Sequence, residues 1–240
     1  MSDPRSEELA SSLARVRGRI ERACAGAGRD PAEITLVVVT KTFPAADVAR
    51  LAALGVTDVG ENRDQEAAAK AAALADLDLR WHFVGQLQRN KSRSVAGYAD
   101  VVHSLDRPGL AQALARGAEQ AGRRIQVLVQ VDLGGPDGVD QTAAGGRGGA
   151  RPDAVGALAD EVAATSALVL KGVMAVAPLG LDPTEAFVRL AQVAVRLRAD
   201  HPQATWVSAG MSGDMEQAVL AGATHLRVGS AILGHRPLLQ

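Results

Sequence analysis

Ile34-Thr-Leu-Val-Val-Val-Thr-Lys41 is the stretch that decides the fold of this chain. Its apolar core is short, continuous and rich in β-branched residues, which is typical of a buried strand. Similar short runs recur along the sequence, and alanine-rich segments with a helical pattern separate them. We predict eight strands, at residues 34–40, 56–60, 80–84, 100–104, 125–132, 169–176, 205–209 and 225–229.

The segments between these strands predict helices, and one further helix precedes the first strand. Eight strands that alternate with helices in 240 residues favour an α/β fold, a single (β/α)8 TIM barrel spanning 1–240. An open, doubly wound sheet needs the same alternation and is the alternative. Glycine-rich residues 134–151 form either a mobile loop after strand 5 or a disordered surface insertion. The predicted helices are 5–27, 44–54, 62–76, 87–97, 107–121, 152–166, 183–199 and 213–221.

Composition excludes several classes of function. The net charge is −1 and the isoelectric point is near 6.5, so no overall field attracts nucleic acid or an anionic membrane. The single cysteine, Cys24, cannot form an intrachain disulfide and fits a reducing compartment. The first residues lack a signal-peptide pattern, and no apolar run is long enough to span a bilayer. We therefore expect a cytoplasmic protein.

The loops after strands 7 and 8 carry the clearest signal for a ligand. In (β/α)8 barrels these two loops commonly form a phosphate site at the carboxyl ends of the strands. Here they read Ser208-Ala-Gly-Met-Ser212 and Gly229-Ser230, with small residues and hydroxyl donors. Ser212 is also predicted to lie at a helix N-terminus, where an anion is favoured. Ordinary turn glycines and capping serines are the alternative interpretation.

Only four of the 26 basic residues are lysines, and lysine is the basic residue that can attack a carbonyl. Lys70 is expected to be solvated on a helix, four residues after Glu66. Lys171 opens strand 6 at the opposite end of the barrel, and Lys91 lies in the helix after strand 3. Lys41 directly follows a buried strand, where partial desolvation favours the neutral amine needed for imine formation. A lysine that only reaches out to water is the alternative.

Arg227 interrupts an apolar strand at a position that can point into the barrel. An inward arginine needs an acceptor, which is either a carboxylate such as Glu61 or a ring nitrogen or phosphate of a ligand. We interpret His82 and His103 as hydrogen-bonded core residues. No residues have the spacing of a metal site or of a nucleophilic triad.

Six motifs occur in order across nearly the whole chain. They are Thr40-Lys41-Thr-Phe-Pro44, Gly60-Glu-Asn62, Trp81-His-Phe-Val-Gly-Gln-Leu-Gln-Arg-Asn-Lys91, Gly172-Val-Met-Ala-Val176, Ser208-Ala-Gly-Met-Ser212 and Arg227-Val-Gly-Ser-Ala-Ile-Leu-Gly234. Together they resemble the pyridoxal phosphate homeostasis protein family, which is similar to the barrel domain of alanine racemase.

The resemblance implies that pyridoxal 5′-phosphate is held as a Schiff base on Lys41, with Arg227 near the pyridine nitrogen. It also implies a role in buffering and delivering the cofactor inside the cell, without established catalysis. Enzymes that use pyridoxal phosphate are the implied recipients, and we expect a monomer. The cofactor contacts implied are Lys41, Asn62, Ser208, Gly210, Met211, Ser212, Arg227, Gly229 and Ser230.

The sequence departs from the family pattern at two places. Arg63 follows Gly-Glu-Asn where the family commonly has tyrosine, and residues 146–149 contain Arg147 where a lysine is common. Arginine cannot form an imine, so Arg147 is not expected to take over a secondary role of that lysine in moving the cofactor.

Two enzymes are the alternatives to a cofactor-holding protein. An amino-acid racemase needs a base on each face of the imine. The only tyrosine, Tyr98, precedes strand 4 and is therefore expected at the opposite end of the barrel, and the chain ends just past the barrel. The other alternative is an aldolase that uses Lys41 on a sugar phosphate.

Overall fold

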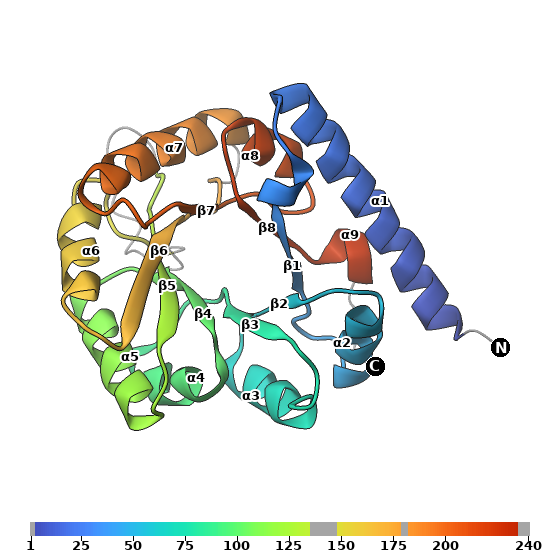
Figure 1. Cartoon of the computed structure of the whole chain (residues 1–240), viewed down its shortest axis with the longest axis horizontal. Coiled ribbons are helices and arrows are strands. Elements are labelled where there is room, and N and C mark those ends of the chain that lie inside the picture. The colour runs from blue at the N-terminus through green and yellow to red at the C-terminus, as the bar shows by residue number, and fades with distance from the viewer. Residues whose placement is uncertain (1–2, 135–147, 179–181, 235–240) are drawn as a thin grey trace.

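The computed structural model describes residues 3–134, 148–178 and 182–234, and within them the strands close into a parallel barrel (Figure 1). Each strand pairs with the next, and β8 pairs with β1 through Thr35–His225 to Val38–Val228. This closure confirms the predicted barrel and excludes the open sheet. The strands are β1 Thr35–Val39, β2 Asp58–Glu61, β3 Arg80–Phe83, β4 Val101–Leu105, β5 Ile125–Gln130, β6 Leu168–Met174, β7 Trp206–Ser208 and β8 His225–Val228.

Helices surround the barrel, and the main hydrophobic core fills the layer between them and the strands (Figure 1). The α-helices are α1 Pro4–Ala27, α2 Ala45–Ala53, α3 Asp64–Ala73, α4 Ser92–Tyr98, α5 Pro108–Gln120, α6 Val155–Ala163, α7 Pro183–Asp200, α8 Met215–Leu220 and α9 Ser230–Leu233. Two single-turn 3-10 helices, Pro31–Glu33 and Arg89–Lys91, complete the described elements.

The extra N-terminal helix is present and is held by its ends and its apolar stripe. Asp3 caps α1, and Leu9, Leu13 and Val16 are buried at helical spacing. On the outer side, Arg19 forms a two-pronged ion pair with Glu216 of α8 at 2.7 and 2.8 Å. Thus α1 packs across α8 and α9 on the outside of the barrel (Figure 1).

Two sequence predictions about local structure need correction. The helix after β7 begins at Met215 and not at residue 213, so Ser212 does not cap it and Asp214 occupies the N-cap position. The four-residue helix α9 was not predicted at all. Most of the glycine-rich segment, residues 135–147, lies outside the described residues; after it, Ala150 pairs with Val131.

Gly172 makes the close contact between β6 and β7 possible. Its φ is +151°, and a Cβ atom there would lie 1.9 Å from the carbonyl oxygen of Trp206. Glycine is therefore the residue that lets these two strands pair at this point.

Candidate functional site

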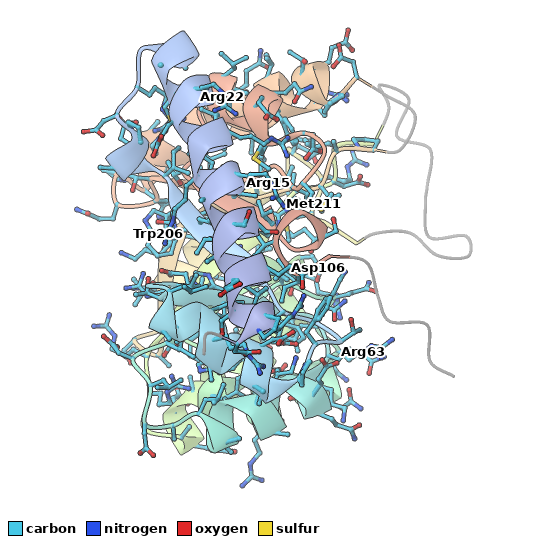
Figure 2. All side chains as sticks on the ribbon, turned by 90° about the vertical axis from the view of Figure 1, so that its right-hand side faces the viewer. Arg15, Arg22, Arg63, Asp106, Trp206 and Met211 are labelled. Carbon is cyan, nitrogen blue, oxygen red and sulfur yellow. The ribbon has the colours of Figure 1, made fainter. Side chains whose placement is uncertain are left out.

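The first and last strands of the barrel bring Lys41 next to the loop after β8. Val38 is the register partner of Val228. A Cβ atom on Gly229 would lie 3.1 Å from the carbonyl oxygen of Val39, so the β8 loop rests directly against the end of β1. In the side view, Arg63 and Asp106 mark the carboxyl ends of the strands, and Trp206 marks the opposite end (Figure 2).

The residues on either side of Lys41 are fixed by two carboxylates. The Thr40 hydroxyl donates to Glu61 Oε1 at 2.6 Å, and the Thr42 backbone N–H donates to Glu66 Oε1 at 2.5 Å. Thr42 has a φ of +70°, a left-handed conformation that is uncommon for a threonine. The tight turn between these anchors holds the backbone of Lys41 in one place.

The Lys41 side chain is exposed, so the partial desolvation expected from the sequence is absent here. Among the described residues, its amine takes part in no hydrogen bond or ion pair, while its backbone is held by the turn. An amine that is sterically accessible on a fixed backbone is suited to form a covalent bond with a carbonyl ligand.

The sequence suggested that Lys70 is solvated, but its side chain is buried. It lies close to the turn that carries Lys41. It is only 6% exposed, and its amine donates to the Thr40 carbonyl at 2.9 Å and to Glu61 and Glu66 at 2.7 Å each. Three acceptors occupy the three N–H groups of an ammonium, which leaves no lone pair for attack on a carbonyl. Burial raises the pKa of Glu61, and its bonds from Lys70 and Thr40 oppose that rise.

The loops after β7 and β8 meet through two serine hydroxyls. Ser230 Oγ donates to Ser212 Oγ at 3.1 Å, and the backbone N–H of Ala231 donates to the same Ser212 oxygen at 3.2 Å. Gly210 supports this approach with a φ of +88°, and a Cβ there would lie 2.6 Å from Ala218 Cβ. The convergence of Ser212, Gly229 and Ser230 that the sequence predicted is therefore present.

Met211 lies at the outer edge of the β7 loop. Its side chain is 39% exposed, and its backbone N–H donates to Asp214 Oδ1 at 2.6 Å. The bond fixes the turn and holds the Asp214 carboxylate against the backbone of the residue before Ser212.

Arg227 points into the barrel as predicted, with 5% exposure. Its guanidinium donates to Ser208 Oγ at 2.6 Å and to the Ala175 carbonyl at 2.9 Å. Glu61, the carboxylate considered from the sequence, is instead bonded to Thr40 and Lys70. Burial lowers the pKa of Arg227 to about 10, so the group remains a cation at neutral pH.

Ser208 differs from the other predicted serines because its hydroxyl faces the interior. It is fully buried and bonded to Arg227 and to His103. Trp206 and Ser208 are two residues apart on β7 and therefore share the inward face. The structure thus does not bring the Ser208 hydroxyl together with Ser212 and Ser230.

Asn62 follows β2, and its Oδ1 atom is buried without a hydrogen-bond partner among the described residues. Its backbone is crowded by the β3 loop, since a Cβ atom on Gly85 would lie 2.3 Å from the Asn62 carbonyl oxygen. A buried polar atom without a partner is costly unless a ligand or water satisfies it.

A chain of polar residues inside the barrel was missed in the sequence. His82 Nδ1 lies 2.8 Å from His103 Nε2, and His82 Nε2 lies 2.9 Å from Asp58 Oδ1. The sequence signal was a polar residue at an inward position of an apolar strand, repeated on β3, β4 and β8. As predicted, His82 and His103 are hydrogen-bonded core residues.

A groove of about 490 Å³ lies at the opposite end of the barrel, between α1 and the start of β1 and β2, with Asp58 in its wall. In residues 3–134, 148–178 and 182–234, no cluster of side chains is suited to hold a metal ion. In the same residues, no helix has both the length and the apolarity needed to cross a membrane.

Known proteins resemble this chain over nearly its whole length. Residues 12–237 match the family described as alanine racemase, N-terminal domain. The chain is 44% identical over 253 residues to the pyridoxal phosphate homeostasis protein of Mycobacterium bovis, covering 98% of this chain and 95% of that protein. The protein of the same name from Pseudomonas aeruginosa is 38% identical, covering 95% of this chain and 96% of that protein.

Among solved structures, PipY from Synechococcus elongatus was determined with pyridoxal phosphate bound. It is 35% identical, with a TM-score of 0.80, and the match covers 94% of this chain and 100% of PipY. From its sequence and its barrel, this chain belongs to the alanine racemase N-terminal domain family and, within it, to the pyridoxal phosphate homeostasis proteins.

Proposed function

We propose that this protein binds pyridoxal 5′-phosphate covalently through Lys41 and maintains the supply of the cofactor without turning over a substrate. The observation that carries the proposal is the exposed amine of Lys41, on an anchored turn, beside the paired hydroxyls of Ser212 and Ser230. A phosphorylated aldehyde needs a site that binds its phosphate and an amine within reach of its aldehyde group.

The phosphate would bind at the junction of the β7 and β8 loops. Ser212 and Ser230 supply hydroxyl donors, and Gly210 and Gly229 leave the backbone uncovered so that an anion can approach it. Met211 positions this turn through its bond to Asp214. We assign Ser208 to the cofactor site through Arg227, and not through the phosphate, because its hydroxyl is committed to the interior.

The pyridine ring would lie between these loops and the end of β2. Arg227 is a donor that cannot accept a proton, so it would hold the ring nitrogen in its unprotonated form. The unpartnered Asn62 Oδ1 is the kind of buried polar atom that a bound ring substituent would satisfy. The residues present therefore fit this cofactor.

When bound, pyridoxal phosphate supplies an aldehyde that condenses with amines and a ring that accepts electrons. The chain's own residues favour binding of the cofactor over catalysis with it. An arginine at the ring nitrogen weakens the ring as an electron acceptor. The one tyrosine of the sequence, Tyr98, is the last residue of α4, three residues before the start of β4 at Val101, and its hydroxyl is buried. The second base of a racemase is thus not supplied by tyrosine.

Recipients would be enzymes that lack their cofactor, and the protein would act as a monomer inside the cell. Both are parts of this proposal. A reversible covalent bond to Lys41 is compatible with transfer, because the amine of a recipient's lysine can replace it.

Reduction of the loaded protein with borohydride, followed by tryptic mapping, tests the assignment of Lys41. Trypsin does not cleave at a modified lysine, so the label is expected on the peptide spanning residues 30–50. The Lys41→Ala variant should lose the visible absorbance band, whereas the matched Lys91→Ala variant should keep it. A label on residues 64–80, which contain Lys70, or on 90–93, which contain Lys91, would contradict the proposal.

A further inference from the structure

Five polar residues form one hydrogen-bonded chain through the centre of the barrel, which we name the interior relay. It runs from Arg227 to Ser208 (2.6 Å), His103 (2.9 Å), His82 (2.8 Å) and Asp58 (2.9 Å). The first four are at most 5% exposed, while the Asp58 side chain is 14% exposed in the groove at the far end. The relay thus spans the barrel from the proposed cofactor site to solvent.

The two end groups differ in what they fix: Arg227 fixes only its own bond to Ser208, whereas an ionised Asp58 fixes the direction of the bonds along the histidines. A guanidinium can only donate, and an ionised carboxylate can only accept. Burial lowers the pKa of both histidines, most strongly that of His103, so both are neutral and each carries one ring proton. Burial alone would raise the pKa of Asp58, but its bonds from His82 and Thr57 bring it below its usual value.

With Asp58 ionised, His82 carries its proton on Nε2 and accepts at Nδ1. His103 must then carry its proton on Nε2 and accept at Nδ1, so the Ser208 hydroxyl donates to it. The Ser208 oxygen is left as an acceptor that faces Arg227. A hydroxyl can donate or accept, whereas a carboxylate can only accept, so Asp58 imposes the direction of the whole relay.

We infer that Asp58 is a positioning residue for the cofactor site, which acts through His82, His103 and Ser208 to hold Arg227 in place. Its effect on the cofactor rests on the proposed function, but the arrangement of protons belongs to the protein alone. Among the described residues, Arg227 makes no hydrogen bond to a carboxylate. Asp214 acts on it only through space, so the hydrogen-bonded path from Arg227 to a carboxylate runs through Ser208 and the two histidines to Asp58.

Imidazole ¹⁵N spectra of the ligand-free protein test the relay directly. We expect His82 and His103 each to show a single neutral tautomer with the proton on Nε2. In Asp58→Ala, water replaces the carboxylate and can donate as well as accept, so both residues should become mixtures of tautomers. In Ser208→Ala, Asp58 still sets the direction of the hydrogen bonds. His82 and His103 should therefore each keep the ring proton on Nε2.

Asp100→Ala is the matched control. Asp100 is also a carboxylate at the amino end of the barrel that acts electrostatically on His82, but it is bonded to the Trp81 backbone and to Arg123. This variant should keep the wild-type tautomers. A proton on Nδ1 of His103 in the wild type, or tautomers unchanged in Asp58→Ala, would overturn the relay.

Titration with pyridoxal phosphate, followed by its visible absorbance, tests the effect on the site. Asp58→Ala should bind about tenfold more weakly, a typical loss when a residue that orients a ligand-binding group is removed. Asp100→Ala should bind as the wild type does. Changed tautomers with unchanged affinity would refute the positioning role. Failure of the wild type to bind would refute the proposed function, and the ligand-free spectra would still decide whether the relay exists.

Discussion

Lys41 and Lys70 lie close together, yet their amines differ in what they can do. Lys70 donates three hydrogen bonds and is enclosed, whereas Lys41 is exposed on a turn whose two ends are bonded to carboxylates. The buried ammonium of Lys70 holds Glu61 and Glu66 together, and these two carboxylates anchor Thr40 and Thr42. Lys70 therefore supports the backbone around Lys41 without competing for a carbonyl ligand.

The first prediction concerns this buried ion pair. Lys70→Met leaves the buried Glu61 carboxylate without its partner, and we expect the free energy of unfolding to fall by about 3–5 kcal/mol in urea titrations. Adding Glu61→Gln removes the unpaired charge and should restore part of the loss. Lys91→Met is the control, because its ion pair with Asp64 at 3.7 Å is partly exposed and should contribute less than about 1 kcal/mol. Equal costs for the two single variants would contradict this account.

At the scale of the element, two short connections matter most: the loops after β7 and β8. They join through Ser212, Ser230 and the backbone of Ala231, and glycines at both loops permit the close approach. Neither loop would form the proposed phosphate site alone, because Ser212 and Ser230 come from different loops.

The second prediction places a negative charge between these loops. Ser212→Asp should repel a phosphate and remove a hydroxyl donor, and so weaken pyridoxal phosphate binding by about 1.5–3 kcal/mol, or more than tenfold. Fluorescence or absorbance titration measures the change. Ser166→Asp, on the exposed turn before β6 at the opposite end of the barrel, adds the same charge away from the loops and should bind normally. Unchanged affinity in Ser212→Asp would move the phosphate site elsewhere.

The third prediction concerns the contact between β6 and β7. In Gly172→Ala the new methyl group would collide with the Trp206 carbonyl, and we expect a loss of more than about 2 kcal/mol in the free energy of unfolding. Gly156→Ala in α6 meets no atom within 4 Å and should stabilise the protein by about 0.5–1 kcal/mol. Thermal or urea unfolding of the two variants should move in opposite directions, and a shift in the same direction would refute the steric explanation.

The sequence predicted the strands well because continuous apolar runs record burial on both faces. It predicted α9 poorly because four residues carry no periodic signal. Lys70 was misinterpreted because a lysine four residues after Glu66 is typical of a solvated helix face, and the sequence does not show that this face packs under Thr40. Ser208 was grouped with the loop serines because a one-residue difference in the end of β7 decides whether its hydroxyl faces inward.

For the molecule as a whole, the interior histidines make stability depend on pH. Burial lowers the pKa of His225 to about 3 and that of His103 well below its usual value, so both remain neutral in the folded protein. In the unfolded chain they bind protons as the pH falls through about 6.5. The unfolded state then holds more protons, so this contribution to stability is complete above about pH 6.5 and is lost progressively below it.

The fourth prediction follows from the direction of this pH dependence of stability. The free energy of unfolding should fall with decreasing pH below about 6.5, by up to about 1.4 kcal/mol per pH unit for each histidine that stays neutral. Urea unfolding at several pH values between about 5 and 7 measures the slope. His225→Gln removes one such group, and its slope should be smaller by that amount. Identical slopes in the two proteins would mean that His225 is protonated in the folded state as readily as in the unfolded chain.

Because β1 pairs with β8, the proposed cofactor would bridge the first and last strands of the barrel. Lys41 follows the first strand of the barrel and Gly229 and Ser230 follow the last, so the ribosome must release all eight strands before a phosphate and an amine can be bridged. Cofactor occupancy would then report that the barrel is closed. Once formed, the bridge connects the two strands whose separation would open the barrel. Bound cofactor should therefore raise the free energy of unfolding, as any ligand of the native state does. A chain whose barrel has not yet closed would leave free pyridoxal phosphate untouched, and only the closed barrel would bind it.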